Sequence, residues 1–199
     1  MIKTTLSEDE QDVLQELVNI AYGNATAVVA EMLEAFATLS IPKIKVIQTQ
    51  KLLKEFSSRK NSSYYFSTQA FIGEFSGETA FFINEESANN LSKHLELESN
   101  EDLDDAILEL TNVLTSSLTT RLSQEMDTEV SFALPTISKI PISEINEVQT
   151  FKQYSQVIVI ETELNFIDQK INADIFILTK DGSIQWLKQR LNNILEEMI

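Results

Sequence analysis

A four-residue pattern that occurs twice constrains this sequence more than any other feature. Each copy contains an Asp, a Glu, an Asn and a Pro, separated by three, two and twenty-two residues. The copies consist of Asp12, Glu16, Asn19 and Pro42, and of Asp105, Glu109, Asn112 and Pro135. Every residue of the second copy follows its counterpart by 93 positions, without an insertion. We therefore predict a single domain over residues 1–199, made of two repeats at about 1–98 and 99–199.

Both halves show the same succession of expected elements. In the first half, apolar periodicity and turn residues predict a helix at 7–37, a strand at 44–47, a hairpin of 64–75 with 78–84, and a short helix at 86–98. In the second half they predict a helix at 101–126, an extended stretch after Pro135, strands at 153–166 and 170–179, and a terminal helix at about 183–198. Each half thus contains a helix, three strands and a second helix. We therefore expect a mixed α/β fold, of the type called α+β.

The two long helices each carry an apolar stripe. In the first helix the stripe residues recur three or four positions apart, and they are Leu14, Val18, Ala21, Ala25, Val29, Met32 and Phe36. In the second helix they are Ile107, Leu114, Leu118 and Leu122. The Asp, Glu and Asn of each copy fall within an arc of roughly 60°, on the side opposite the stripe. We expect the stripes to pack on the sheet and the polar residues to face outward.

Composition and charge exclude several classes of function. The chain has no cysteine, so disulfides, thiolate metal sites and cysteine nucleophiles are ruled out. A net charge of −16 disfavours binding to nucleic acid and to anionic membrane surfaces. We find no signal-peptide run and no membrane-spanning stretch, and we therefore expect a cytoplasmic protein without membrane insertion. The one histidine, His94, lies in an amphipathic segment and is expected at the surface or its boundary.

An exposed Glu and Asn one helical turn apart suit a particular kind of chemistry. An amide has no relevant pKa and cannot act as a general base, but it can hold a water molecule by donating to it and accepting from it. Such positioning matters most when water attacks a phosphoryl group that is already activated. A nearby carboxylate can pair with a Lys or Arg of a protein substrate. One such set is common on solvated helix faces, but two copies in register make chance a poor explanation.

The duplicated pattern resembles the signature of the CheC/CheX/FliY phosphatases of bacterial chemotaxis. The segment Gln11–Ala25 is similar to that family's opening helix, and Val157–Leu164 and Ile171–Thr179 resemble the C-terminal hairpin of the CheC type. The resemblance covers essentially the whole chain. It implies a pseudo-twofold α/β fold with one sheet of about six strands and the two long motif helices on one face.

The resemblance also implies an activity, which is hydrolysis of the phospho-aspartate of a CheY-like response regulator. Asn19 and Asn112 would position the attacking water, and Glu16 and Glu109 would pair with the regulator's active-site lysine. Asp12 and Asp105, which begin the two copies, would have supporting roles. The regulator would supply Mg²⁺, so no cofactor or metal of the chain's own is expected.

The match departs from the family pattern near the second Asn. The family often has Gly before the Asn, where this chain has Val18 and Thr111. Gly23 follows the first Asn, whereas Val113–Ser117 contains no glycine, so we expect the second site to fit less well. Two motif copies favour the CheC type over the CheX type, and we do not expect the FliY type, because its switch-binding domain would have no room after Leu195. A CheD-like protein is a further possible partner.

Two other functions remain open on the sequence. A non-catalytic module could bind a receiver domain or a CheD-like protein without hydrolysing anything. A metal-dependent hydrolase could form if the helices brought together four carboxylates, those of Asp12, Glu16, Asp105 and Glu109.

Overall fold

The computed structural model describes residues 5–57, 63–147, 156–179 and 181–197. The elements in chain order are α1 (Glu8–Met32), β1 (Thr38–Leu39), β2 (Lys43–Gln48), α2 (Thr49–Ser57), β3 (Ser63–Gly73), β4 (Gly77–Asn84), α3 (Glu85–His94), α4 (Asn100–Glu125), β5 (Val130–Phe132), β6 (Thr136–Pro141), the 3-10 helix η1 (Ile142–Glu147), β7 (Gln156–Phe166), β8 (Ile171–Thr179) and α6 (Asp181–Glu197). Positions 153–155 of a predicted strand and 198 of the predicted terminal helix lie outside the described residues.

The strands form one antiparallel sheet whose pairing repeats between the two halves. Its order is β1–β7–β8–β4–β3–β5, with β2 also on β7 and β6 also on β3, which gives eight strands. Lys43 lies opposite Glu161, and Thr136 lies opposite Thr68. Exchanging halves at the offset of 93 converts one pair into the other. We expected about six strands; β1 and β5, of two and three residues, are too short to show alternation in the sequence.

Reciprocal capping begins both long helices. In α1 the backbone N–H of Glu10 donates to Ser7 Oγ at 3.2 Å, and the N–H of Ser7 donates to the Glu10 carboxylate at 2.7 Å. In α4 the corresponding bonds join Ser99 and Asp102 at 3.1 and 2.9 Å. These capping boxes satisfy backbone donors that would otherwise lack partners and fix where each helix begins.

The first helix ends earlier than its apolar pattern predicts. α1 stops at Met32, and Glu34 adopts a left-handed φ of 46°. Phe36, which we placed in the buried stripe, is 72% exposed, because the chain has already turned away from the sheet. His94 Nε2 lies 2.8 Å from the Leu33 carbonyl, which can only accept, so the partly buried histidine caps the helix end. Its expected boundary position is confirmed.

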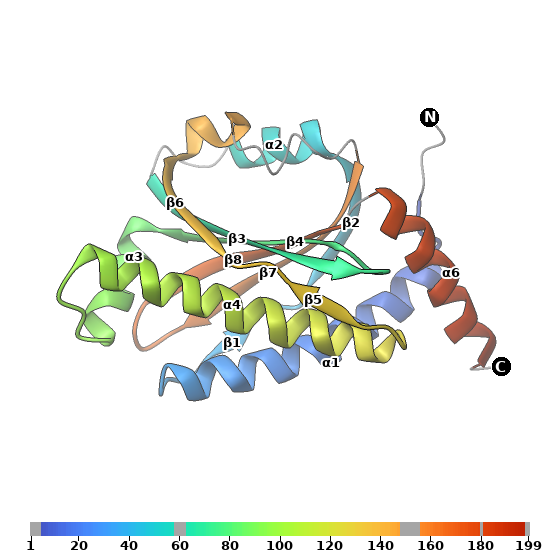
Figure 1. Cartoon of the computed structure of the whole chain (residues 1–199), viewed down its shortest axis with the longest axis horizontal. Coiled ribbons are helices and arrows are strands. Elements are labelled where there is room, and N and C mark those ends of the chain that lie inside the picture. Colours follow the sequence, from blue (N-terminus) through green and yellow to red (C-terminus); the bar gives the residue numbers. More distant parts are fainter. Residues whose placement is uncertain (1–4, 58–62, 148–155, 180, 198–199) are drawn as a thin grey trace.

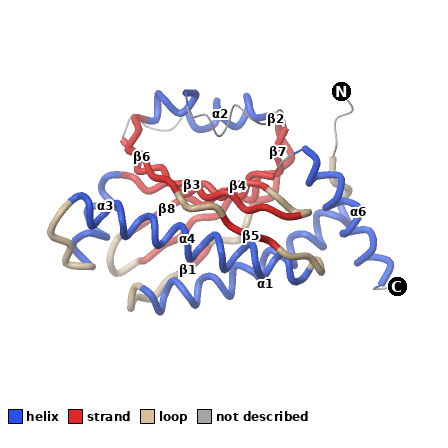
Figure 2. The backbone as a smooth tube through the Cα atoms, viewed as in Figure 1, coloured by secondary structure: helices blue, strands red, loops and turns tan. Residues whose placement is uncertain are grey.

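Helices cover both faces of the sheet (Figures 1 and 2). The motif helices α1 and α4 lie side by side on one face, as expected, and the larger core lies between them and the strands. α2 and η1 cover the opposite face over a second core that includes Phe56, Phe82 and Phe176. The rings of Phe56 and Phe176 meet edge to face with centroids 4.8 Å apart. This second helical layer was not predicted.

The long helices are amphipathic rather than apolar all round. α1 and α4 contain 25 and 26 residues, enough to cross a bilayer by length alone. Charged side chains occupy their exposed sides, and no helix in the described ranges is apolar enough to span a membrane.

Candidate functional site

The first copy of the pattern lies on the outer face of α1. Asp12, Glu16 and Asn19 are all exposed, whereas Leu14 and Val18 on the opposite side are buried. The predicted outward orientation is therefore observed. Asn19 Oδ1 accepts a hydrogen bond of 3.1 Å from Gln15 Nε2, one turn earlier on the same helix. An exposed i, i+4 pair of this kind restrains a side chain only weakly.

The last turns of α6 flank the first copy. A hollow of about 400 Å³ beside the helix is lined by Asp9, Asp12, Val13, Glu16, Leu17, Ile194 and Leu195. Its three carboxylates are exposed, whereas its four aliphatic side chains are buried or half-buried. Asn19 is not among the lining residues. The first copy thus presents Glu16 beside an apolar surface, with the amide outside the hollow.

The structure brings the whole second copy together around one hollow. Its volume is about 600 Å³, and it is lined by Gln69, Asp105, Leu108, Glu109, Asn112, Phe132, Ala133, Leu134 and Pro135. Asp105 and Glu109 are exposed, and Asn112 is half-buried. All four pattern residues of the second copy therefore line the same hollow, although Pro135 lies 23 positions after Asn112.

A buried glutamine holds the second Asn. Gln69 on β3 is 2% exposed, and its Nε2 donates to Asn112 Oδ1 at 2.9 Å. The same nitrogen donates to the Ala133 carbonyl at 2.9 Å. The amide of Asn112 is thereby tied both to the sheet and to the connection before Pro135. Sequence reasoning did not identify Gln69, because it precedes Asn112 by 43 residues and belongs to no local pattern.

Within the described part of the chain, the first half shows no equivalent of this contact. At the offset of 93, Gln69 corresponds to Thr162 and Ala133 to Ser40. The Thr162 hydroxyl donates to the Ser40 carbonyl at 2.7 Å. A hydroxyl has a single proton, so Thr162 cannot also donate to Asn19. The two copies share their residue pattern but differ in how the amide is held.

The larger residues before each Asn face inward. Val18 and Thr111 are 1% and 0% exposed, and the Thr111 hydroxyl donates to the Ile107 carbonyl at 2.8 Å. Neither side chain therefore crowds the outer face that carries Asn19 or Asn112. The expectation that bulk near the second Asn weakens that site stays a prediction, because Val113 beyond it is half-buried.

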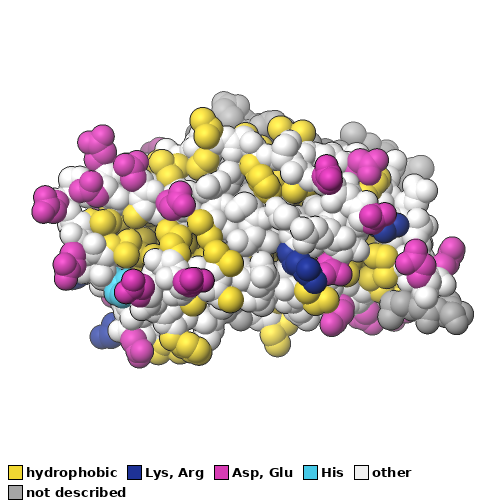
Figure 3. Space-filling view, turned by 60° about the horizontal axis from the view of Figure 1, so that its bottom comes forward, with side chains coloured by type: hydrophobic (Ala, Val, Ile, Leu, Met, Phe, Trp, Pro, Cys, Tyr) yellow, Lys and Arg dark blue, Asp and Glu magenta, His cyan; other side chains and the backbone are white. Residues whose placement is uncertain are grey.

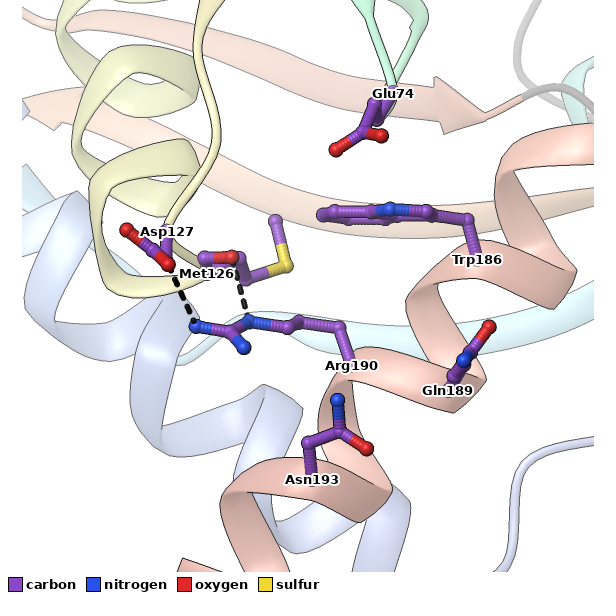
Figure 4. A pocket seen from close by; sticks show the side chains of 7 residues that line it. All are labelled: Glu74, Met126, Asp127, Trp186, Gln189, Arg190 and Asn193. Carbon is purple, nitrogen blue, oxygen red and sulfur yellow. Dashed lines mark hydrogen bonds and ion pairs between the residues drawn. The ribbon is translucent and has the colours of Figure 1, made fainter.

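Another hollow, of about 340 Å³, lies beside Trp186 and contains none of the predicted site residues (Figure 4). Arg190 crosses it to the end of α4, where Nε lies 2.6 Å from the Met126 carbonyl and Nη2 lies 3.7 Å from Asp127. Arg190 thus caps α4 as His94 caps α1, so this hollow has a structural use.

The four pattern carboxylates do not come together as a metal site. Among the residues that the structure describes, no three His, Asp or Glu side chains are arranged to hold an ion. The clustering of Asp12, Glu16, Asp105 and Glu109 on which the metal-hydrolase interpretation depended is therefore not seen.

The face formed by the two long helices is acidic. Asp and Glu side chains are spread over it among apolar patches, with few Lys and Arg side chains between them (Figure 3). Within the described ranges, no hydrogen bond or ion pair engages the carboxylates of Glu16 or Glu109. Both are therefore available to a cationic group of another molecule.

Comparison with known proteins identifies the fold. No protein-family model and no curated protein matches the sequence. Among solved structures, FliY of Thermotoga maritima is 14% identical with a TM-score of 0.77 over 96% of this chain and 99% of that one. FliM in the FliM–SpeE complex of Helicobacter pylori is 16% identical with a TM-score of 0.65, over 95% and 97%. A chemotactic CheC-like protein of Shewanella oneidensis is 15% identical with a TM-score of 0.54, over 82% and 97%.

These likenesses confirm the fold that the resemblance implied. The chain has the α+β architecture shared by FliY, FliM and CheC-like chemotaxis proteins. They do not confirm the expected CheC subtype, since the TM-score is 0.77 with FliY and 0.54 with the CheC-like protein.

Proposed function

We propose that this chain hydrolyses the phospho-aspartate of a CheY-like receiver domain in a chemotaxis-type signalling system. The observation that carries the proposal is the second hollow, where Asp105, Glu109 and Asn112 line one wall and the amide is anchored from behind. The fold is one found in chemotaxis proteins, and the paired Glu and Asn recur on both long helices.

The chemistry asks little of the chain beyond positioning. Water attacks the phosphorus in line, the bond from phosphorus to the aspartate oxygen breaks, and the products are inorganic phosphate and a free carboxylate. Asn112 would hold the water through its Nδ2 hydrogens and the remaining lone pair of Oδ1. The receiver would supply Mg²⁺ and the phosphoryl group, so no cofactor of this chain's own enters the step.

Glu109 would orient the receiver rather than react. Its exposed carboxylate lies three residues before Asn112, one turn along α4. A lysine of the receiver that pairs with Glu109 would bring the phosphoryl group to the amide. Asp105 lies one further turn away and would add negative charge for the same cation. On α1, Glu16 and Asn19 would have the corresponding roles, with Asp12 supporting them.

The test is phosphate release from a phosphorylated CheY-like receiver, with this chain present in substoichiometric amount. We expect acceleration by the unaltered chain and loss of about 10²-fold or more in the Asn19→Ala, Asn112→Ala double variant. Asn24→Ala is a matched control, because Asn24 is another exposed Asn on α1 outside the pattern. Full activity in the double variant would refute the assignment.

A non-catalytic docking module is the second candidate, and the first hollow favours it. Glu16 lies there beside Ile194 and Leu195, but Asn19 does not line the space. A hollow lined by both carboxylates and aliphatic side chains suits a partner surface that carries a cation and an aliphatic side chain. FliM of Helicobacter pylori, which shares the fold, occurs in complex with another protein, SpeE. Binding of a receiver or of a CheD-like protein without faster dephosphorylation would favour this function.

A further inference from the structure

We infer that Gln69 is a positioning residue for Asn112, and that the second site is consequently the faster of the two, the reverse of the ranking expected from the missing glycine. The inference rests on the proposed phosphatase function. Gln69 would not touch the receiver or the water. It would act only by holding the amide of Asn112 in one orientation.

The contacts of Gln69 determine which way the Asn112 amide faces. The Ala133 carbonyl can only accept, so the nitrogen of the Gln69 amide must point toward it. The second hydrogen of that nitrogen then meets Asn112 at 2.9 Å, and the atom there must also be an acceptor. Oδ1 of Asn112 is therefore turned toward β3, and Nδ2 is turned away from Gln69. The two orientations of the Asn112 amide differ only by exchange of Oδ1 and Nδ2. The Ala133 carbonyl distinguishes them, because it fixes the orientation of the Gln69 amide.

The other end of Gln69 indicates that the residue does not serve packing alone. Its Oε1 is buried and has no hydrogen-bond partner among the described residues. Burying an unpaired amide oxygen is unfavourable, and an apolar side chain of similar length would avoid it. Packing alone therefore does not explain a glutamine at position 69, whereas the hydrogen bond to Asn112 does.

Pre-orientation of the amide matters because water must be held in line with the bond that breaks. A side chain whose rotation is already restricted loses less freedom when the water and the receiver bind. Asn112 is half-buried and held from the sheet, whereas Asn19 is exposed and, among the residues that the structure describes, bonded only to the neighbouring Gln15 on the helix surface. The corresponding Thr162 already donates to Ser40. The two sites would therefore differ in turnover despite equivalent Glu and Asn residues.

The test uses chains in which Asn19→Ala removes the first site. Gln69→Met keeps the length of the side chain but cannot hydrogen-bond, and Gln69→Thr reproduces the residue of the first half. We expect kcat to fall about tenfold or more while KM for the phosphorylated receiver stays unchanged. Thr79→Val is the matched control, because Thr79 lies opposite Gln69 on β4 and its buried hydroxyl has no described partner. It should leave kcat unchanged.

A second measurement separates failure of this inference from failure of the proposed function. The Asn112 side-chain amide, assigned in ¹⁵N–¹H NMR spectra by its loss in Asn112→Ala, should give a shifted and slowly exchanging pair of signals. In Gln69→Met the pair should move to the values of a free amide, with thermal melts confirming that the variant is folded. Unchanged Asn112 signals, or an unchanged kcat beside an active parent, would overturn the inference. If the Asn19→Ala chain is inactive but its Asn112 signals are shifted and slowly exchanging, only the proposed phosphatase function would be refuted.

Discussion

Glu10 joins the start of α1 to α6, and Glu10→Ala should lower the free energy of unfolding by about 3 kcal/mol. Its carboxylate accepts hydrogen bonds from Lys188 Nζ at 2.8 Å, Asn192 Nδ2 at 3.0 Å and the Ser7 N–H at 2.7 Å. The Glu10 side chain is 5% exposed and that of Lys188 is 30% exposed. Removing one partner of a buried pair costs about 3–5 kcal/mol, and the partial exposure of Lys188 places this pair at the low end.

The same contacts make this contribution depend on pH. Burial alone would raise the pKa of Glu10, but hydrogen bonds from Lys188, Ser7 and Asn192 and the charge of Lys188 outweigh it, and the pKa is lowered. The folded state therefore binds fewer protons than the unfolded state at acid pH. The stabilisation is complete above the ordinary pKa of 4.5 and is lost as pH falls through the lowered value.

Urea unfolding of the Glu10→Gln variant tests this reasoning. The single tryptophan, Trp186, lies in α6 and reports on that helix by fluorescence, while circular dichroism reports on the whole chain. The difference in unfolding free energy from the unaltered chain should shrink between about pH 6 and pH 3. Glu8→Gln, an exposed acid in the same first turn, is the control and should have little effect. A difference that is constant with pH, or equal losses in both variants, would refute the role of Glu10.

Two further predictions concern a buried hydroxyl and an exposed leucine. The Tyr22 hydroxyl is buried without a hydrogen-bond partner among the described residues, and burial raises its pKa above the usual range. Tyr22→Phe should therefore raise the free energy of unfolding in urea by about 1 kcal/mol. A decrease of the same size would contradict this reasoning. Leu134 is 89% exposed beside the second hollow; with Asn19→Ala present, Leu134→Ser should raise KM for the receiver about fivefold with kcat unchanged. The counterpart Ile41, 80% exposed in the first half, should tolerate the same change, and equal effects of the two substitutions would argue against docking at Leu134.

The correspondence between the two halves could be predicted because the same spacing of residues occurs in both. A sustained apolar stripe and the Ser–acid caps mark where α1 and α4 begin and which face of each is buried, so both helices can be located from local sequence. The offset of 93 then requires the two halves to pair in the same register. The outward position of Glu16 and Glu109 follows from the same helical period.

The missed features depend on tertiary contacts. Phe36 continues the apolar spacing of α1, but the left-handed turn at Glu34 removes it from the helix face. α2 is short, and its apolar residues Leu52 and Phe56 gain their stability from packing on the outer face of the sheet. Gln69 could be recognised only when β3 was placed beside α4. The alternation of residues along a strand indicates which face of the sheet a side chain lies on, but not which helix residue it contacts.

The most direct test of the central claim is the turnover number for phosphate release from a phosphorylated CheY-like receiver. We expect many turnovers per chain, with the acceleration lost when Asn19 and Asn112 are both replaced by Ala and retained in Asn24→Ala. Unchanged turnover in the double variant would contradict it, as would receiver binding with no acceleration by the unaltered chain.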